Sequence, residues 1–150
     1  MDFSIKEISY SDVLPIWENK LWPQRQDPIR PLSSMSLGGS YDMDIYKNAK
    51  PSFMGLFHDT KLVGVLSGHP SSGEHYRVRG LYVDEGYRRK GGAHRLFAAF
   101  QDLAFKEGHK VLWSYPKLEA LPVYLKFGFH LHSSKQHDEN HVYVFLNAVT

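Results

Sequence analysis

Glycines and basic side chains gather in one short segment whose composition suits the binding of phosphate groups. Residues 88–93 read Arg-Arg-Lys-Gly-Gly-Ala, after an apolar stretch from Tyr76 to Val83 and before a helical pattern. Gly91 and Gly92 let an anion approach the main-chain amides at the start of that helix, where the helix dipole also favours negative charge. The segment therefore predicts a site for a phosphorylated cofactor, and the alternative interpretation is a solvated run of charge at a turn.

The positive charge of the chain is local. Of its 18 Lys and Arg residues, six lie between positions 77 and 95, where there are two of the 16 Asp and Glu residues. A net charge of +2 is too small to indicate a nucleic-acid surface, so no nucleic-acid partner is expected.

Length and composition exclude several other classes of protein. The 150 residues suffice for one domain with a core, and we expect a single domain over residues 1–150. Because the chain has no cysteine, disulfides, thiolate metal sites and a cysteine nucleophile are excluded. No window approaches the roughly 20 apolar residues of a membrane span, and no basic stretch precedes an apolar one at the N-terminus. We therefore expect a cytoplasmic protein with no membrane partner.

The pattern of apolar residues predicts strands interleaved with helices. Strands are expected at residues 3–8, 52–57, 62–67, 76–83, 110–115, 129–133 and 141–146, and helices at about 11–21, 92–107 and 118–126. Ser11 is the expected N-cap of the first helix, and Gly108 the left-handed cap of the second. The crossover from residues 76–83 to 110–115 should be parallel and right-handed.

Two stretches between these elements lack such periodicity. Residues 23–51 contain several Pro and Gly residues, with one short helix or turn expected around Tyr41 to Tyr46. Irregular segments of this kind often shape a binding cleft. Residues 134–140 are expected to form a polar turn.

Two motifs occur in a fixed order in the second half of the chain. The loop Arg88-Arg89-Lys90-Gly91-Gly92-Ala93 follows Leu81-Tyr82-Val83-Asp84, and Ala120-x-x-x-Tyr124-x-x-Phe127-Gly128-Phe129 comes later. The first is similar to Arg/Gln-x-x-Gly-x-Gly/Ala, and the pair resembles the GNAT superfamily of acyl-CoA-dependent N-acetyltransferases. The resemblance implies an α/β (α+β) fold, with a mixed, mostly antiparallel sheet of six to seven strands, flanking helices and one splayed parallel strand pair.

The resemblance implies acetyl-CoA as the acyl donor. The pantetheine arm would pair with the backbone of the splayed strand, and the diphosphate would bind amides of the glycine loop, neutralised by Arg88 or Lys90. Lys117 stands where relatives often carry an asparagine that contacts the cofactor. The residues implied in cofactor binding are Leu81, Tyr82, Val83, Arg88, Arg89, Lys90, Gly91, Gly92, Ala93, His94 and Lys117, with Arg95 as a further contact.

The implied reaction is direct attack on the acetyl thioester by the primary amine of a small acceptor. Tyr124 matches the family's general acid, because a phenol of pKa about 10 can protonate a thiolate of similar basicity. The alternative for Tyr124 is a core aromatic residue on a short helix. Either way, the reaction requires no protein nucleophile.

The general base is less well defined by the sequence. Many relatives carry a glutamate or histidine on the strand before the loop, but here the positions hold Arg77 and Arg79, which cannot accept a proton. Glu74 and His75 lie just before that strand and His69 ends the previous one, so these are the candidate bases, acting through water.

The same two arginines hint at the nature of the acceptor. Arg77 and Arg79 alternate onto one face of the predicted strand. If that face looks into the acceptor cleft, they favour a carboxylate or phosphate, and otherwise they pair with acidic neighbours on an exposed sheet face. In this family the acceptor site is walled by the irregular region, which here offers Trp22, Arg25, Arg30, Tyr41 and Tyr46.

Two functions of different class remain open. One is an N-acetyltransferase acting on a small amine that could be anionic, and the other is a catalytically silent acyl-CoA-binding regulatory or interaction module of the same fold. A homodimer is also left open. No metal site is predicted, because His130-x-His132 has no third ligand at convincing spacing.

Overall fold

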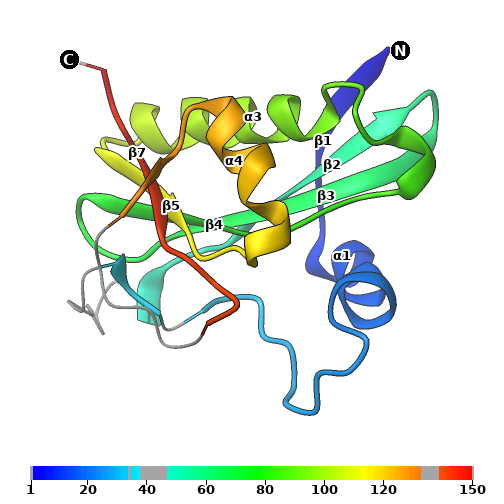
Figure 1. Ribbon diagram of the computed structural model, residues 1–150, viewed down its shortest axis with the longest axis horizontal. Helices are drawn as coiled ribbons and strands as arrows, with labels where there is room; N and C mark the ends of the chain where they lie inside the picture. The colour runs from blue at the N-terminus through cyan, green and yellow to red at the C-terminus, as the bar shows by residue number, and fades with distance from the viewer. Residues whose placement is uncertain (1, 34, 38–46, 133–138, 150) are drawn as a thin grey trace.

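Seven strands of the described residues form one sheet with helices on both faces (Figure 1). The structure is a computed structural model that describes residues 2–33, 35–37, 47–132 and 139–149. The strand order is β1-β2-β3-β4-β5-β7-β6. The elements are β1 (Phe3–Ile8), α1 (Tyr10–Ile16), the π-helix η1 (Trp17–Leu21), β2 (Ser52–His58), β3 (Lys61–Pro70), β4 (His75–Val83), the 3₁₀ turn η3 (Glu85–Tyr87), α3 (Gly92–Lys106), β5 (Val111–Ser114), the 3₁₀ turn η4 (Leu118–Ala120), α4 (Leu121–Phe127), β6 (His130–Leu131) and β7 (Val144–Asn147).

The expected strands are all present, and the glycine cap of the second helix is confirmed by a φ of +93° at Gly108. The short helix or turn expected around Tyr41 to Tyr46 lies outside the described residues, as does most of the polar turn at 134–140.

The expected cap of the first helix was wrong. Ser9, not Ser11, is the N-cap of α1, and its hydroxyl accepts a hydrogen bond from the Asp12 amide at 3.3 Å. The Asp12 carboxylate in turn accepts the Ser9 amide at 3.1 Å. This reciprocal pair needs an acidic residue three positions after the cap, a spacing that Ser9 has and Ser11 lacks.

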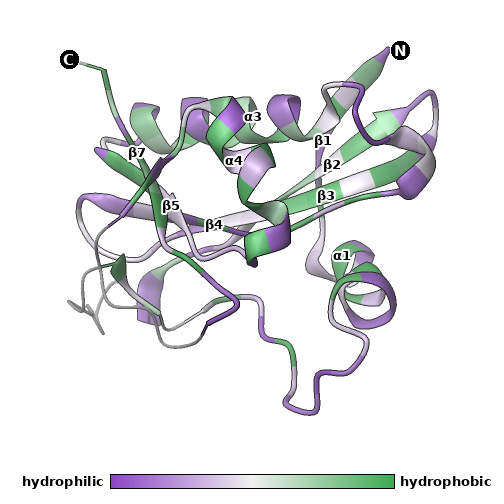
Figure 2. Ribbon diagram, viewed as in Figure 1, coloured by the Kyte–Doolittle hydropathy of each residue, from purple (hydrophilic) through white to green (hydrophobic). Residues whose placement is uncertain are grey.

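The helices divide between the two faces of the sheet. α3 and α4 cover one face and form the larger core cluster with the central strands, whereas α1 and η1 pack on the other face (Figure 1). Buried positions of α3 recur at helical spacing, because one stripe of the helix faces the sheet. Figure 2 shows hydrophobic residues along the central strands and a largely hydrophilic loop after η1.

The parallel pair of the sheet separates after three residues. β4 pairs with β5 from His75 to Arg77, but it continues to Val83 while β5 ends at Ser114. Beyond the last paired residue, the Ser114 hydroxyl donates to the Val78 carbonyl at 2.7 Å and replaces a ladder bond. The splayed parallel pair implied by the resemblance is confirmed.

A β-bulge bends β4 where it leaves β5. Gly80 and Leu81 together face Leu66 of β3, and Gly80 has a φ of +75°. The indole of Trp17 donates to the Gly80 carbonyl at 2.9 Å, and a Cβ at Gly80 would lie 2.3 Å from that ring. The bulge therefore needs glycine both for its backbone conformation and for its contact with Trp17.

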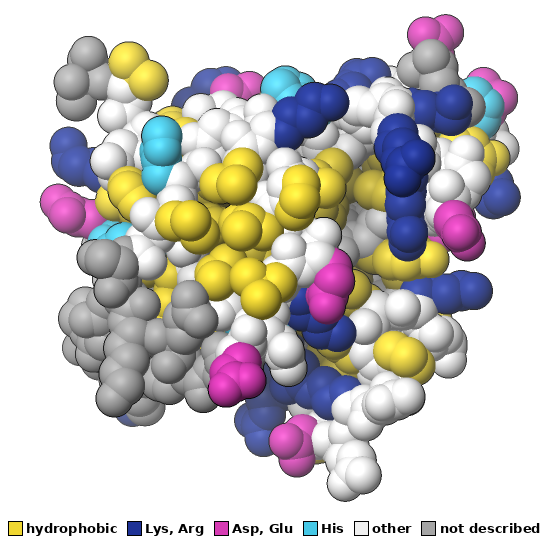
Figure 3. Space-filling view, viewed as in Figure 1, with side chains coloured by type: hydrophobic (Ala, Val, Ile, Leu, Met, Phe, Trp, Pro, Cys, Tyr) yellow, Lys and Arg dark blue, Asp and Glu magenta, His cyan; other side chains and the backbone are white. Residues whose placement is uncertain are grey.

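Exposed hydrophobic side chains gather over α4 and its flanks (Figure 3). They include Leu118, Val123, Leu125 and Leu131. Nothing in the described residues covers them, and a homodimer stays a prediction.

We predict that Gly80→Ala destabilises the fold by about 2 to 4 kcal/mol, since a positive φ and an overpacked contact each carry a cost. The measurement is the free energy of unfolding in denaturant. Gly86→Ala is the matched control, because a Cβ there meets no atom within 4 Å and its φ is not positive. Equal losses in both variants would show that Trp17 does not fix the bulge.

Candidate active site

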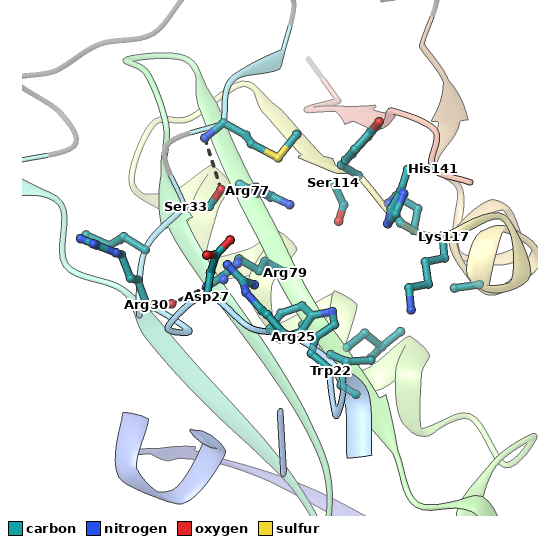
Figure 4. Close-up of a pocket in the computed structure, with 18 of the residues that line it drawn as sticks. Trp22, Arg25, Asp27, Arg30, Ser33, Arg77, Arg79, Ser114, Lys117 and His141 are labelled. Carbon is teal, nitrogen blue, oxygen red and sulfur yellow. Dashed lines mark hydrogen bonds between the residues drawn. The ribbon is translucent and has the colours of Figure 1, made fainter. Parts of the chain in front are cut away.

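The separation of β4 from β5 opens into a cavity of about 740 Å³ (Figure 4). One wall is β4 from Arg77 to Leu81, and another is the segment 114–117 that follows β5. Residues between Leu21 and Ser33 also line the cavity, and so do Ala120 and Tyr124. Strand, loop and helix thus bring together residues that are far apart in the sequence.

Arg79 lies against two indole rings in this wall. Its guanidinium carbon is 5.0 Å from the ring centre of Trp17 and 5.2 Å from that of Trp22, and its Nη1 donates to the Arg30 carbonyl at 2.7 Å. Stacking of this kind holds a guanidinium in a fixed orientation. The side chain is buried although it carries a charge.

Arg77 is the second buried arginine of the wall. It lies over the ring of Trp113 at 5.0 Å, and its Nη1 donates to the Ser33 hydroxyl. Burial, followed by the charge of Arg79, lowers the pKa of Arg77 to about 9, so the group stays charged at neutral pH. The exposed sheet face considered for these arginines is therefore not what the structure contains.

Tyr124 contributes to the cavity from α4. Its ring packs 4.8 Å from that of Phe97 and 5.4 Å from that of Phe129, so the side chain is also part of the core. Burial raises the pKa of the Tyr124 hydroxyl, while a hydrogen bond with Ser114 and the charge of Arg77 act in the opposite direction. Tyr124 is thus a core aromatic residue that also lines the cavity, and its role as general acid stays a prediction.

The glycine loop leads into α3 with its amides uncapped. No side chain caps this helix, whose N-cap is Gly91 with a φ of +84°, and Arg89 is also left-handed with a φ of +63°. A Cβ at Gly91 would meet no atom within 4 Å, so there is open space above the loop. Gly92 differs, because a Cβ there would lie 2.4 Å from the Leu56 side chain. Gly92 packs the helix on the sheet, and Gly91 leaves room for a ligand.

The other residues expected at the cofactor surround this loop. The Arg88 side chain donates from Nε to the Val83 carbonyl at 2.7 Å and lies over the Tyr82 ring. Lys90 is exposed, and so is His94, which packs beside Phe127 at 4.9 Å. Of the other residues expected at the cofactor, Leu81 and Lys117 line the cavity. Val83 lies in the core, and Ala93 packs against that core. The Arg95 side chain donates to the Phe3 carbonyl.

The candidate bases lie outside the cavity lining. Glu74 and His75 stand at the start of β4, where the Glu74 carbonyl accepts the amides of Lys110 and Val111. His69 is buried, and its two ring nitrogens contact the Pro70 carbonyl at 2.9 Å and the Ser33 amide at 3.2 Å. A base role for any of them stays a prediction.

Sequence reasoning missed two proton acceptors that the structure brings into the cavity. Asp27 lies on the loop, and His141 stacks on Tyr115 at 5.1 Å beside Lys117 (Figure 4). No local signal marked them, because an isolated bridge pairs Lys117 with His141, 24 residues away in the sequence, and Asp27 sits in an irregular loop. Tyr41 and Tyr46 lie outside the described residues.

Within the part of the chain that the structure describes, three or more potential metal ligands do not converge anywhere. The same residues contain no helix of the length and apolar character that a membrane crossing requires.

Comparisons with known proteins agree with this fold. The model of the acetyltransferase (GNAT) family matches residues 14–129, and the chain belongs to that family of acetyl-CoA-dependent enzymes. A search of curated proteins by sequence finds no match.

Solved structures show the same fold at low sequence identity. A proposed acyl-CoA N-acyltransferase from Klebsiella pneumoniae is 16% identical with a TM-score of 0.71, and 97% of each chain is covered. Ard1 from Thermoplasma volcanium is 18% identical with a TM-score of 0.68 over 100% of both chains. The PaiA N-acetyltransferase from Thermoplasma acidophilum, in complex with coenzyme A, is 15% identical with a TM-score of 0.67 over 99% of this chain and 100% of that one.

We predict that His69 makes the fold sensitive to acid. Burial lowers the pKa of His69 from 6.5 to about 4, so between these values the unfolded chain binds the proton more tightly. The free energy of unfolding keeps its full value above pH 6.5 and falls by up to about 3 kcal/mol as the pH approaches 4. Unfolding in denaturant at several pH values measures this loss, which should be smaller in His69→Gln. His130→Gln, at an exposed position, should keep the wild-type profile, and an unchanged profile in His69→Gln would contradict the prediction.

Proposed function

We propose that the chain transfers the acetyl group of acetyl-CoA to the primary amine of a small acceptor by direct attack. The observation that carries the proposal is the joint arrangement of an uncapped α3 N-terminus, a split strand pair and a buried tyrosine facing the resulting cavity. Each part has a separate chemical role, as follows.

The glycine loop supports binding of the coenzyme A diphosphate. The first amides of a helix have no partner within the helix, and the dipole at that end is positive. Gly91 leaves open space at these amides, and Arg89 and Lys90 are exposed beside it. Charge-assisted hydrogen bonds of this kind contribute about 1.5 to 3 kcal/mol each.

The splayed strand supports binding of the pantetheine arm. β4 loses its partner after Arg77, and Gly80 and Leu81 line the cavity beyond that point. Acetyl-CoA supplies the thioester whose carbonyl carbon is attacked. A chain that enters over Gly91 and follows β4 would bring that thioester to the region of Tyr124.

Tyr124 is proposed as the general acid. The amine nitrogen forms a bond to the carbonyl carbon, the carbon–sulfur bond breaks, and the phenol gives its proton to the sulfur that leaves. Because burial raises the pKa of Tyr124, the hydroxyl stays protonated throughout the neutral range. The buried positive charge of Arg77 favours the phenolate that this transfer leaves behind.

The amine must lose a proton before or during attack. Asp27 and His141 are the proton acceptors of the cavity lining, and Glu74 and His75 remain candidates that act through water. Whichever of these residues acts as the base, the proton of the amine finally passes to the solvent in the cavity.

The cofactor site is tested by charge at Gly91. Asn and Asp both tolerate a left-handed backbone, so Gly91→Asn is the matched neutral control for Gly91→Asp. We predict that Gly91→Asp binds coenzyme A about tenfold or more weakly than Gly91→Asn, because a carboxylate beside the loop repels the diphosphate. Isothermal calorimetry measures both affinities. No heat from the wild-type protein, or equal affinities for the two variants, would refute the site.

The general acid is tested by Tyr124→Phe, which keeps the ring and removes the proton. We predict a loss in kcat on the order of 100-fold with unchanged coenzyme A affinity, measured as thiol release from acetyl-CoA with a panel of small amines. Tyr143→Phe is the control, since Tyr143 is buried against Trp113 outside the cavity lining. Coenzyme A binding without acceptor-dependent thiol release in the wild type would favour the silent module instead.

A further inference from the structure

The cavity carries a large excess of positive charge. Five of its lining residues are Lys or Arg and one is acidic, namely Arg25, Arg30, Arg77, Arg79, Lys117 and Asp27. An acceptor that enters this cavity meets a positive potential on several sides (Figure 4).

Arg77 has no anionic partner in the part of the chain that the structure describes. Among the described residues no carboxylate lies within the 4.0 Å that would make an ion pair with it, and its Nε is buried without a hydrogen-bond acceptor. Its Nη1 donates to Ser33, which is a neutral acceptor. The side chain is only 7% exposed, and the water that reaches it from the cavity supplies no opposite charge.

A buried charge without a counter-charge is costly. The desolvation penalty for an ion in a protein interior is large, and an opposite charge with good hydrogen-bond geometry is what offsets most of it. The contact with the Trp113 ring offsets part of this penalty, but an aromatic ring carries no net negative charge. A role in holding Ser33 does not require a charge either, because a neutral donor would serve.

We propose that the acceptor carries an anionic group, a carboxylate or a phosphate, that binds at the Arg77 guanidinium. The inference rests on the proposed function and names the class of amine on which that function acts. Nη1 already donates to Ser33, and two oxygens of a carboxylate or a phosphate can accept from the donors that remain on the guanidinium. Arg79, held against Trp17 and Trp22 two residues along β4, adds its charge to the same wall.

The arrangement also explains why the strand before the loop carries arginines. On this strand their side chains point away from Tyr76 and Val78, which lie in the core under α3, and toward the cavity. The rest of the acceptor, with its amine, then lies in the cavity that Tyr124 also lines. One wall thus orients the acceptor by its anionic end.

The test compares matched pairs of acceptors that differ in one charge. Glycine, 4-aminobutyrate and glutamate are each measured against their carboxamides, and phosphoethanolamine against ethanolamine, as kcat/KM for thiol release from acetyl-CoA. We expect the anionic member of at least one pair to be favoured by about 10- to 100-fold, as one or two charge-assisted hydrogen bonds allow. The pair with the largest ratio distinguishes carboxylate from phosphate.

Substitution of Arg77 assigns the preference to this residue. Arg77→Met keeps the length and apolar volume of the side chain, and the ratio should fall close to one, whereas Arg77→Lys keeps the charge and should retain part of it. Coenzyme A affinity and the melting temperature of each variant show whether the fold is intact. Equal turnover of charged and neutral amines by the wild type overturns the inference and leaves the proposed function standing.

A binding measurement keeps the inference independent of turnover. In the presence of coenzyme A, N-acetylglycine and 4-acetamidobutyrate are titrated against their amides while the Nε–H resonance of Arg77 is followed by NMR. We expect the resonance, assigned by its loss in Arg77→Lys, to shift with the anions and not with the amides. If it shifts with none of them, the inference fails whether or not acetyl transfer is observed.

Discussion

The structure depends on keeping β4 apart from β5 without leaving buried backbone groups unpaired. Three successive carbonyls of β4 accept hydrogen bonds from side chains: Val78 from Ser114, Arg79 from Ser67 and Gly80 from Trp17. A buried carbonyl without a donor costs about 1 to 3 kcal/mol, and these bonds satisfy three carbonyls of β4 beyond its last residue paired with β5. The three donors come from β5, β3 and η1, so the strands on either side of β4 and a helix on one face of the sheet hold β4 in place beside the gap.

The split sheet separates two kinds of ligand chemistry. On one side, the glycine loop offers main-chain amides and open space at the start of α3. On the other, the loop after η1 and the face of β4 that carries Arg77 and Arg79 form a charged wall. Tyr124 comes from α4 on the first side and reaches the cavity between them. A reaction between two bound molecules needs this geometry, because each must approach the reacting atoms from its own direction.

Much of the fold could be predicted from the sequence, because local patterns determine it. Alternating and helical spacings marked the strands and α3, and the glycine loop and Tyr124 were found from motifs. The expectation of Ser11 as the cap was wrong because Ser9 suits a cap equally well, and only Ser9 has an acidic residue three positions on.

The burial of Arg77 and Arg79 could not be predicted. Alternation places both side chains on one face of a strand, but it does not say what covers that face. The cover is the loop that contains Arg30 and Ser33, a segment with no periodicity. Asp27 and His141 were missed for the same reason, since long-range contacts bring them to the cavity.

The placement of the aromatic rings gives this protein an internal optical reporter. The sequence contains three tryptophans, and all of them lie beside the charged wall: Trp17 and Trp22 against Arg79, and Trp113 against Arg77. Indole emission responds to nearby charge, and all of the tryptophan emission of the chain originates from rings in contact with the two arginines. Occupancy of the cavity should therefore be readable from the unlabelled protein, without a background from tryptophans elsewhere.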